Sequence, residues 1–564
     1  MRFLRNSLRA IVRPFARISE RFSAGSAEYS PGGGALAGAG YGIGVLRTAT
    51  APGWRKLVRW SVVAFGFALY FAMQLLLAYL CNQLMWIFIV AFMVIVACLV
   101  FAAAKPTATY IFWLAFSPLG FIFLRMDFGS GIPTISFDRV TIAALAGFLI
   151  LRTLLHRHRI KRPITGEALT LLHIAYIALA LYVMHPGSVR EILRTLAEKF
   201  DHIALALIAY YIAKSVLATR KQLLGAIIAL VVAGGYSALS AFYEHFTGLR
   251  WFSSFLPVES RLGYADVGRA CGPLINPSAL GTFLGITAFL TYHLYYNLQR
   301  KSLKMFLLAL ILVQLIGCYF TYTRGGYIAP AMLLLLMPFF AKAYRKYYVG
   351  LLVGAVIAVI VAAPIVASNR QIHRRLTKQS TMLGRVVITA GTLNIVKHHP
   401  VFGIGLGQID YGLEKYITNA GTLSGWYARG MQPLQIYPQK KLYPVITSHN
   451  SFLTILAEEG LVGGFLYLGS FIAFIVHLFR VRARLPDEGI LGKDLIALLI
   501  VGSVGHFIST LTYDIRFFKY PNYVLWAMFA IGVRLGEIVN EEALAHKNAD
   551  IKDDRGKTPV LTHV

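Results

Sequence analysis

The chain has 564 residues, of which 57% are hydrophobic and only 14% charged, and its formal net charge is +30 at pH 7. Soluble domains carry about a quarter charged residues because their surfaces face water. The composition therefore excludes an ordinary soluble protein and predicts an all-α, polytopic integral membrane protein.

The first 60 residues are predicted to form a basic cytoplasmic segment ahead of the membrane domain. Arginines recur every three or four residues, at Arg2, Arg5, Arg9, Arg13 and Arg17. This spacing favours an amphipathic helix on the inner leaflet, although a disordered basic tail fits the pattern equally well. A glycine-rich linker follows at 31–44. We find no short apolar core with a cleavage site, and so expect no cleavable signal peptide.

Residues 61–536 are predicted to be the membrane domain. A helix needs about 20 apolar residues to cross the hydrocarbon core. Fourteen candidate spans satisfy this approximately: 61–81, 84–104, 108–124, 139–155, 167–184, 200–217, 223–243, 274–296, 305–323, 326–341, 348–367, 452–479, 494–512 and 521–536. Because the segments near 108, 326 and 521 are short, we expect twelve to fourteen helices.

Basic residues cluster in short segments between the apolar runs. The clusters are Arg152 with Arg157, Arg159, Lys161 and Arg162; Lys342 with Arg345 and Lys346; and Arg480 with Arg482 and Arg484. Threading the spans from a cytoplasmic N-terminus places all of them inside, as the positive-inside rule requires. The same threading makes residues 537–564 a cytoplasmic tail, which we expect to be disordered from Asn540. This placement of charge excludes nucleic acid as a partner.

The threading also leaves one long extracytoplasmic segment, 368–449, and a smaller outer loop from Thr247 to Pro273. The long segment is polar and contains no 20-residue apolar run. Loops of this length are uncommon and usually functional. We therefore expect the active site on the periplasmic face of a bacterial inner membrane.

Arg324 marks the first candidate site residue, in the sequence Thr321-Tyr322-Thr323-Arg324-Gly325-Gly326. An arginine at a membrane boundary needs water, a partner or an anionic ligand. A snorkelling arginine is the structural alternative. The two glycines allow a close backbone approach and favour a functional role.

Arg385 is the second candidate, and it precedes the run from His398 to Gly407. The adjacent histidines do not predict a metal site, because neighbouring helical residues point in different directions and no further ligand accompanies them. The glycine run lacks the Lys-Ser/Thr ending of a phosphate-binding loop. We expect it to form a turn that lets two backbones pack closely.

His449 is the third candidate, because it opens a predicted span from the outer side. Histidine is the side chain whose ordinary pKa suits proton transfer near neutral pH, although a single interfacial histidine often has a structural role. Glu458 and Glu459 lie deeper in the same span and are expected to face the interior of the bundle.

Taken in order, these motifs resemble the O-antigen ligase and O-antigen polymerase superfamily. The resemblance extends from Arg269 to Gly464. It includes the Arg269–Pro273 segment with Asn276-Pro277, Arg324 before Gly-Gly, Arg385 before His-Pro-Val-Phe-Gly-Ile-Gly-Leu-Gly, and His449-Asn450 through Gly464. The chain departs from the family pattern at Thr389, where an aromatic residue is common.

The resemblance implies a reaction and a set of roles. Such enzymes move a glycan from undecaprenyl diphosphate to an acceptor hydroxyl by one inverting displacement, with no nucleotide sugar, metal or other cofactor. Arg324 and Arg385 would hold the donor diphosphate, since guanidinium makes paired bonds to phosphate oxygens. His449 would remove the acceptor proton. Substrate-binding roles are expected for three further residues: Arg269, Asn450 and Glu458.

Several functions share these motifs. The long polar loop favours a polymerase of O-antigen or exopolysaccharide, because it offers a surface for a growing chain. The alternatives are an O-antigen ligase that transfers to lipid A-core, an O-oligosaccharyltransferase, a transporter or flippase, and a membrane scaffold. Expected partners are the lipid-linked glycan, an acceptor glycan or lipid, membrane lipids, and a chain-length regulator and flippase.

Overall fold

The computed structural model describes residues 86–123, 125–126, 135–155, 163–184, 192, 195, 201–251, 269–341, parts of 345–364, 379–409, 413, 448–487, 489–514 and 518–556. All of these lie in one compact unit, Trp86–Val564. The predicted N-terminal segment and the first predicted span, 61–81, belong to a separate unit, Met1–Met85, and lie outside the described residues.

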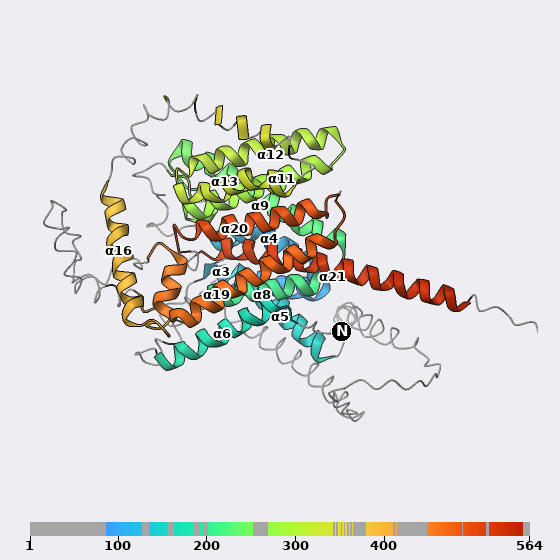
Figure 1. Ribbon diagram of the computed structural model, residues 1–564, viewed down its shortest axis with the longest axis horizontal. Helices are drawn as coiled ribbons and strands as arrows, with labels where there is room; N and C mark the ends of the chain where they lie inside the picture. Colours follow the sequence, from blue (N-terminus) through green and yellow to red (C-terminus); the bar gives the residue numbers. More distant parts are fainter. Residues whose placement is uncertain are drawn as a thin grey trace, which may run out of the picture. The chain divides into compact units, whose positions relative to one another are not determined.

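Long helices make up nearly all of the described chain (Figure 1). They are α3 (Trp86–Ala104), α4 (Pro106–Phe123), α5 (Phe137–Leu154), α6 (Thr165–Met184), α8 (Asp201–Val216), α9 (Arg220–Thr247), α11 (Pro277–Asn297), α12 (Lys301–Phe320), α13 (Arg324–Phe340), α16 (Gln379–His398), α19 (Ser451–Arg484), α20 (Lys493–Ser509) and α21 (Lys519–Gly556). A 3₁₀ turn, η4 (Gly272–Leu274), precedes α11. The predicted all-α class is confirmed for the described residues, apart from two short antiparallel strands, β1 (Arg125–Met126) and β2 (Ile135–Ser136).

The predicted spans from 84–104 to 326–341, and from 452–479 to 521–536, each coincide with one helix. Over the described residues, α9, α12, α19 and the Lys519–Ala545 part of α21 are long and apolar enough to cross a membrane. Shorter apolar stretches occur in α6, α8 and α13. The exact number of spans therefore stays a prediction.

Large apolar side chains cover the outside of these helices. Phe306, Phe339 and Phe465 are 61%, 73% and 74% exposed. Contiguous apolar surface of this kind is unusual on a soluble monomer. It suits contact with lipid, and it supports the predicted membrane domain.

Small residues hold the inner helices close together. α11 packs against α12 and α13, and α13 packs against α20. A Cβ atom on Gly281 of α11 would lie 2.9 Å from the Cα atom of Gly326 in α13, and one on Gly505 of α20 would lie 3.0 Å from the Cα atom of Ala329. Glycine at such contacts lets two helix backbones approach, which drives helix association where no water is present.

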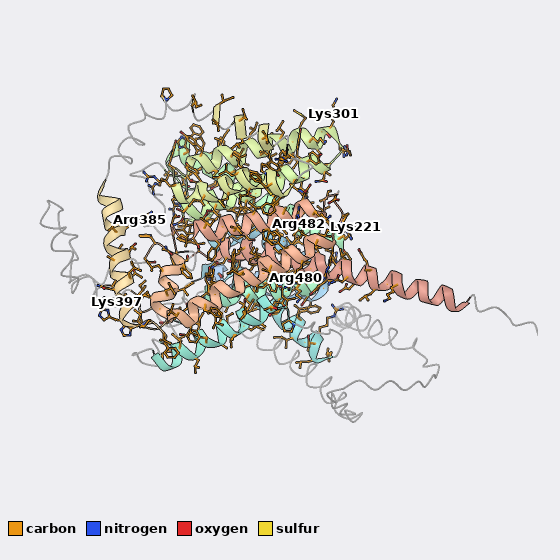
Figure 2. All side chains as sticks on the ribbon, in the orientation of Figure 1. Lys221, Lys301, Arg385, Lys397, Arg480 and Arg482 are labelled. Atoms are coloured by element: carbon orange, nitrogen blue, oxygen red, sulfur yellow. The ribbon has the colours of Figure 1, made fainter. Side chains whose placement is uncertain are left out.

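α16 lies across one end of the other helices, which we call the α16 end (Figure 1). Figure 2 places Arg385 and Lys397 on α16 there, and Lys221 and Lys301 toward the opposite end. Several members of the predicted cytoplasmic clusters lie at that opposite end: Arg152 is in the last turn of α5, and Arg482 and Arg484 are in the last turn of α19. The arrangement agrees with the predicted threading.

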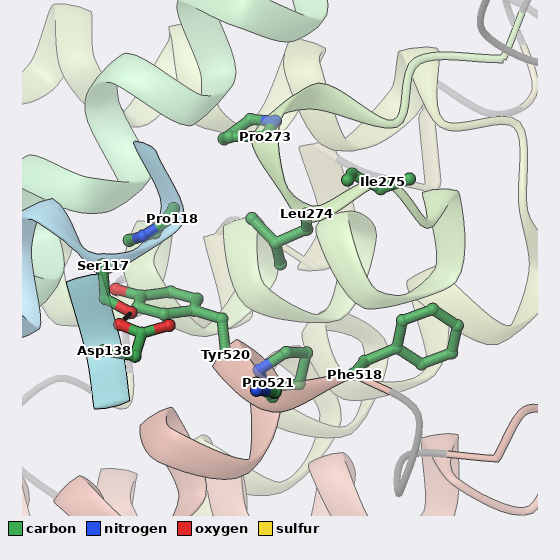
Figure 3. Close-up of a pocket in the computed structure, with 10 residues that line it drawn as sticks. Ser117, Pro118, Asp138, Pro273, Leu274, Ile275, Phe518, Tyr520 and Pro521 are labelled. Carbon is green, nitrogen blue, oxygen red and sulfur yellow. Dashed lines mark hydrogen bonds between the residues drawn. The ribbon is translucent and has the colours of Figure 1, made fainter. Parts of the chain in front are cut away.

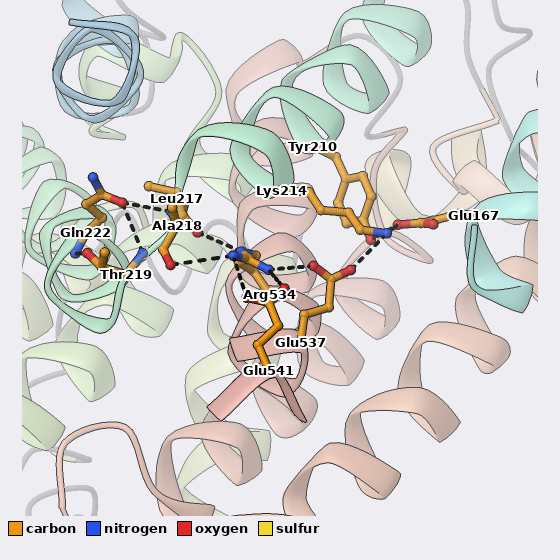
Figure 4. A network of polar contacts seen from close by, with 10 residues as sticks. All are labelled: Glu167, Tyr210, Lys214, Leu217, Ala218, Thr219, Gln222, Arg534, Glu537 and Glu541. Atoms are coloured by element: carbon orange, nitrogen blue, oxygen red, sulfur yellow. Dashed lines mark hydrogen bonds and ion pairs between the residues drawn. The ribbon is translucent and has the colours of Figure 1, made fainter. Parts of the chain in front are cut away.

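A buried charge network joins α6, α8 and α21 near the opposite end (Figure 4). Lys214 Nζ lies 2.6 Å from Glu167 Oε1 and 3.2 Å from Glu537 Oε1. Tyr210 also donates to Glu167 Oε1, at 2.6 Å. Glu167 is fully buried, so these partners replace the water that an ionised carboxylate needs.

The predicted disorder of the C-terminal tail is wrong for the described residues from Asn540 to Gly556, and contacts of the same network show why. α21 continues through Asn540 to Gly556. Arg534 donates to Glu537 and Glu541 one and two turns further along the helix, at 2.9 and 3.0 Å. Glu542 then pairs with Arg220 at 2.7 Å. These contacts stabilise α21 beyond residue 536, where the predicted apolar span ends.

Candidate functional site

The α16 end gathers the turns that carry the predicted site residues. The starts of α11, α13 and α19 meet the ends of α12 and α20 there. Arg269 precedes η4, Arg324 is the first residue of α13, Arg385 lies within α16, and His449 precedes α19. Asn450 is the N-cap of α19, and Glu458 lies two turns further in.

Arg324 is exposed at the tip of the turn between α12 and α13. Two hydroxyls shape this turn, since Thr321 Oγ1 donates to Cys318 O at 2.8 Å and Thr323 Oγ1 donates to Thr321 O at 2.7 Å. A Cβ atom on Gly325 would collide with Thr512 Oγ1, in the turn after α20. The expectation that the two glycines permit close packing is confirmed. Arg324 therefore lies beside the 510–514 turn.

His449 lies on a backbone that the adjoining residues hold firmly. Ser448 is buried, and its Oγ donates to Asn450 O at 2.6 Å. Asn450 Oδ1 accepts from Leu453 N at 3.0 Å and so caps the helix. Ser451 N donates to Thr510 O at 2.9 Å, and Ser451 Oγ donates to Tyr513 O at 3.1 Å. The start of α19 is thereby tied to the same 510–514 turn that contacts Gly325.

Left-handed backbone marks this end of the molecule. Among the described residues, three that are not glycine have a positive φ: Ile275 (60°), Tyr322 (44°) and His449 (54°). Each lies within two residues of a predicted site motif, at Asn276, Arg324 or His449 itself. Such conformations are costly and concentrate at ligand sites, where the surrounding structure enforces them.

The charges around His449 come from two other elements. Partial burial of the ring and the positive charge of Arg385 lower the pKa of His449 below 6.5, while the negative charge of Asp514 opposes them. Arg385 and Asp514 are therefore near enough to act on the imidazole. The result is a neutral imidazole at pH 7, which is able to accept a proton.

Asp514 is a candidate site residue that our sequence analysis missed. It is 2% exposed and follows the turn after α20. The available signal was its position, two residues beyond the predicted span 494–512 on the same side as His449. A single aspartate at the end of a span is not by itself a sequence signal of function. Only the structure relates it to His449.

The segment after α16 is inserted into a break in α19. Four backbone hydrogen bonds join the two: Leu461 N to Pro400 O (2.8 Å), Val462 N to Val401 O (3.2 Å), Ile404 N to Ala457 O (3.0 Å) and Gly405 N to Glu458 O (2.8 Å). They use backbone groups of α19 that the break leaves without helical partners. We call this contact the clasp.

Two glycines make the clasp possible. Gly460 has φ 67° and ψ −166°, and Gly403 has φ 72°. A Cβ atom on Gly460 would overlap the carbonyl of Val401, and one on Gly403 would overlap that of Glu458. The predicted role of the glycine run as a close-packing turn is confirmed. The clasp links α16, which carries Arg385, to α19, which follows His449.

Glu458 and Glu459 are each 1% exposed, as expected for residues that face the interior. Glu458 Oε1 accepts from Ile409 N at 3.3 Å, beyond the glycine run. Glu459 Oε2 lies 2.6 Å from His173 Nε2 on α6. These contacts support the clasp from inside. Substrate binding by Glu458 stays a prediction, as it does for the helix cap Asn450.

Arg269 is placed beside the end of α12, because Ala270 N donates to Phe320 O at 3.0 Å. Glu244 Oε2 then accepts from both Cys271 N and Gly272 N, each at 2.8 Å, and fixes the start of η4. Arg269 thus lies near the beginning of the turn between α12 and α13, and Arg324 lies at the end of that turn. Within the described ranges, no three His, Cys, Asp or Glu side chains are grouped closely enough to hold a metal ion.

Comparison with known families identifies part of this chain. Residues 306–468 match the family model described as O-Antigen ligase. The match contains Arg324, Arg385, His449 and Glu458, while Arg269 and Asp514 lie on either side of it. The resemblance predicted from the motifs is confirmed. No curated protein matches the sequence.

Proposed function

We propose that this chain, which carries an O-antigen ligase domain at residues 306–468, is a membrane glycosyltransferase. It moves a glycan from an undecaprenyl-diphosphate carrier to an acceptor hydroxyl. The observation that carries the proposal is the shared 510–514 turn, which contacts Gly325 beside Arg324 and is hydrogen-bonded to Ser451 close to His449. This arrangement suits a proton acceptor next to a site for an anionic donor.

Arg324 and Arg385 are proposed to hold the diphosphate. Both side chains are exposed, and neither forms an ion pair with a described carboxylate. Guanidinium stays charged and binds phosphate oxygens in pairs. Arg324 also stands at the first position of α13, where the backbone N–H groups and the helix dipole favour an anion. The two arginines thus stabilise the charge that develops on the leaving group.

His449 is proposed to take the acceptor proton. The acceptor oxygen attacks the anomeric carbon as its proton passes to the imidazole, and the bond from that carbon to the diphosphate oxygen breaks. The electron pair leaves on the diphosphate, and the configuration inverts. Asp514 stabilises the imidazolium that forms, since its charge already favours protonation of His449. No metal or nucleotide enters this scheme.

The site is proposed to face the periplasm. The basic residues in the last turns of α5 and α19 lie at the opposite end, and such residues remain cytoplasmic. A cysteine at Lys397 should react with an impermeant thiol reagent in intact spheroplasts, and one at Lys301 should not. Labelling of the Lys301 position alone would invert this orientation.

A polymerase of O-antigen or exopolysaccharide remains our preferred activity, and an O-antigen ligase is the alternative. The length and polar composition of segment 368–449 support the preference, because a growing glycan chain needs a polar surface to bind. A chain-length regulator and a flippase are then the expected partners. Deleting the gene separates the two: a polymerase mutant accumulates single repeat units, whereas a ligase mutant accumulates long lipid-linked chains.

The direct test uses purified protein in nanodiscs with lipid-diphosphate-linked glycan extracted from the producing cells. Transfer should proceed without ATP, without an ion gradient and in the presence of EDTA. A requirement for magnesium or manganese would show that a cation neutralises the diphosphate, and our roles for Arg324 and Arg385 would be wrong. Transport of the glycan without a new glycosidic bond would favour the flippase.

A further inference from the structure

A cavity of about 240 Å³ lies at the α16 end, between the end of α4, the start of α5, η4 and the start of α21 (Figure 3). Its walls include Ser117, Asp138, Leu274, Ile275, Phe518 and Tyr520. The mechanism above uses none of these residues. Few polar groups on mostly apolar walls are typical of a small-molecule site.

The cavity adjoins the proton-accepting side of the candidate site. The ring of Phe518 packs edge-on against Tyr513, with their centres 6.0 Å apart. Tyr513 precedes Asp514, and its carbonyl accepts from Ser451 at the start of α19. One wall of the cavity therefore packs against the 510–514 turn, which contains Asp514.

The opposite wall contains a strained residue. Ile275 has φ 60° and ψ 5°, a left-handed conformation that a β-branched side chain rarely adopts. Glycine would accept this backbone without steric cost. The chain instead keeps an isoleucine there, in the cavity wall (Figure 3). Strain of this kind is characteristic of positions that contact a ligand.

We infer that this cavity binds the terminal sugar of the acceptor glycan, an inference that rests on the proposed glycosyltransferase function. A sugar ring has an apolar C–H face, which suits the Phe518 ring and the apolar wall at Leu274 and Ile275. Its hydroxyls are donors. Asp138 is buried at the cavity wall, and an ionised carboxylate accepts about four hydrogen bonds.

The chemistry of the cavity walls favours a sugar over the diphosphate and the polyprenyl tail of the donor. Asp138 Oδ1 accepts from Trp113 Nε1 at 2.9 Å and from Ser117 Oγ. The lining residues include one cation, Lys519, and no arginine. The buried carboxylate of Asp138 repels the donor diphosphate, and a single ammonium group makes no paired hydrogen bonds to it. The carboxylate equally disfavours a polyprenyl tail, which has no donor to offer a buried carboxylate.

The test measures transfer with the extracted lipid-linked glycan as donor and with oligosaccharides released from the same cells' polymer as soluble acceptor. Leu274→Trp fills the cavity, and Phe518→Ala removes the stacking surface. Each should raise the acceptor concentration for half-maximal rate about tenfold, with the donor dependence unchanged. Leu312→Trp is the matched control, because it adds the same indole to an outward-facing, 54% exposed position on α12.

Ile275→Gly provides a second test in case Leu274→Trp does not fold. It relieves the strained backbone, so thermal unfolding should stay at least as high as in the wild type while the acceptor dependence still weakens. Wild-type acceptor dependence in Phe518→Ala and Ile275→Gly would overturn the cavity assignment. A change in donor dependence alone would also overturn it, in favour of the lipid-linked substrate. A wild-type protein that transfers no glycan at all would instead overturn the proposed function.

Discussion

The two ends of the helical unit differ in whether their charged side chains are paired with one another. At the opposite end, ion pairs inside the protein join four charged side chains: Glu167, Lys214, Glu537 and Arg534 (Figure 4). At the α16 end, Arg324 and Arg385 are exposed, and strained or tightly packed backbone holds His449 and Arg324 in place. Charges that satisfy one another stabilise the fold, whereas charges held in place by backbone remain available to a substrate.

The difference lies also in how each end is built. Charged side chains connect α6, α8 and α21 at the opposite end, while the clasp connects α16 to α19 through hydrogen bonds between two backbones. Backbone contacts fix position without consuming functional groups. The clasp therefore fixes α16, which carries Arg385, against α19, which follows His449.

The largest effect is expected from removing the proton acceptor. His449→Ala should lower turnover by about a hundred- to ten-thousand-fold, which corresponds to roughly 2.7–5.4 kcal/mol. Thermal unfolding and donor binding should stay at their wild-type values, because the histidine serves the acceptor. The control is His399→Ala, an exposed histidine beyond the end of α16. Near-normal turnover in folded His449→Ala protein would contradict our assignment and favour the scaffold or transporter.

At the opposite end the expected loss is one of stability. Lys214→Met leaves Glu167 and Glu537 without the cation between them. Removing one partner of a buried pair costs about 3–5 kcal/mol. Unfolding in detergent should occur at a lower temperature, while activity per folded molecule stays unchanged.

The matched control for this stability loss is Arg220→Gln, which breaks the exposed pair with Glu542. Exposed pairs contribute about 0–1 kcal/mol. If Lys214→Met instead abolished turnover in protein that unfolds normally, the contrast between the two ends would be lost. The network would then have to take part in the reaction.

A smaller effect is expected from changing the shape of a cation while keeping its charge. Arg324→Lys loses the paired hydrogen bonds of guanidinium, and hydrogen bonds to charged groups contribute about 1.5–3 kcal/mol. The rate at low donor concentration should fall by roughly ten- to a hundredfold. Lys397→Arg on α16 is the control. Wild-type rates in both variants would mean that overall positive charge, rather than one guanidinium, attracts the donor.

Sequence reasoning found the helices because each needs only a local apolar run of sufficient length. It named Arg324, Arg385 and His449 as candidates because their motifs occur in a characteristic order. It missed Asp514 and the Glu167–Lys214–Glu537 network, since these depend on contacts between residues far apart in the chain. It also ended the last helix too early, because hydropathy does not register the ion pairs of Arg534 that extend α21 beyond Asn540.

The smallest expected effect, a displacement of the pH profile, distinguishes the two charges that act on His449. The base must be neutral, so the rate falls as the pH drops through the pKa of His449, which lies below its usual 6.5. Arg385 lowers this pKa, and Arg385→Gln should therefore raise it and move the acidic limb of the rate profile to higher pH. Asp514 raises it, so Asp514→Asn should move the limb to lower pH. The profile of the maximal rate for each variant checks both directions in one assay, whatever the loss in absolute rate. A merely structural role for Asp514 would lower the rate at every pH and leave the limb in place. Displacement of both variants in the same direction would show that the two charges do not flank the imidazole in the working enzyme.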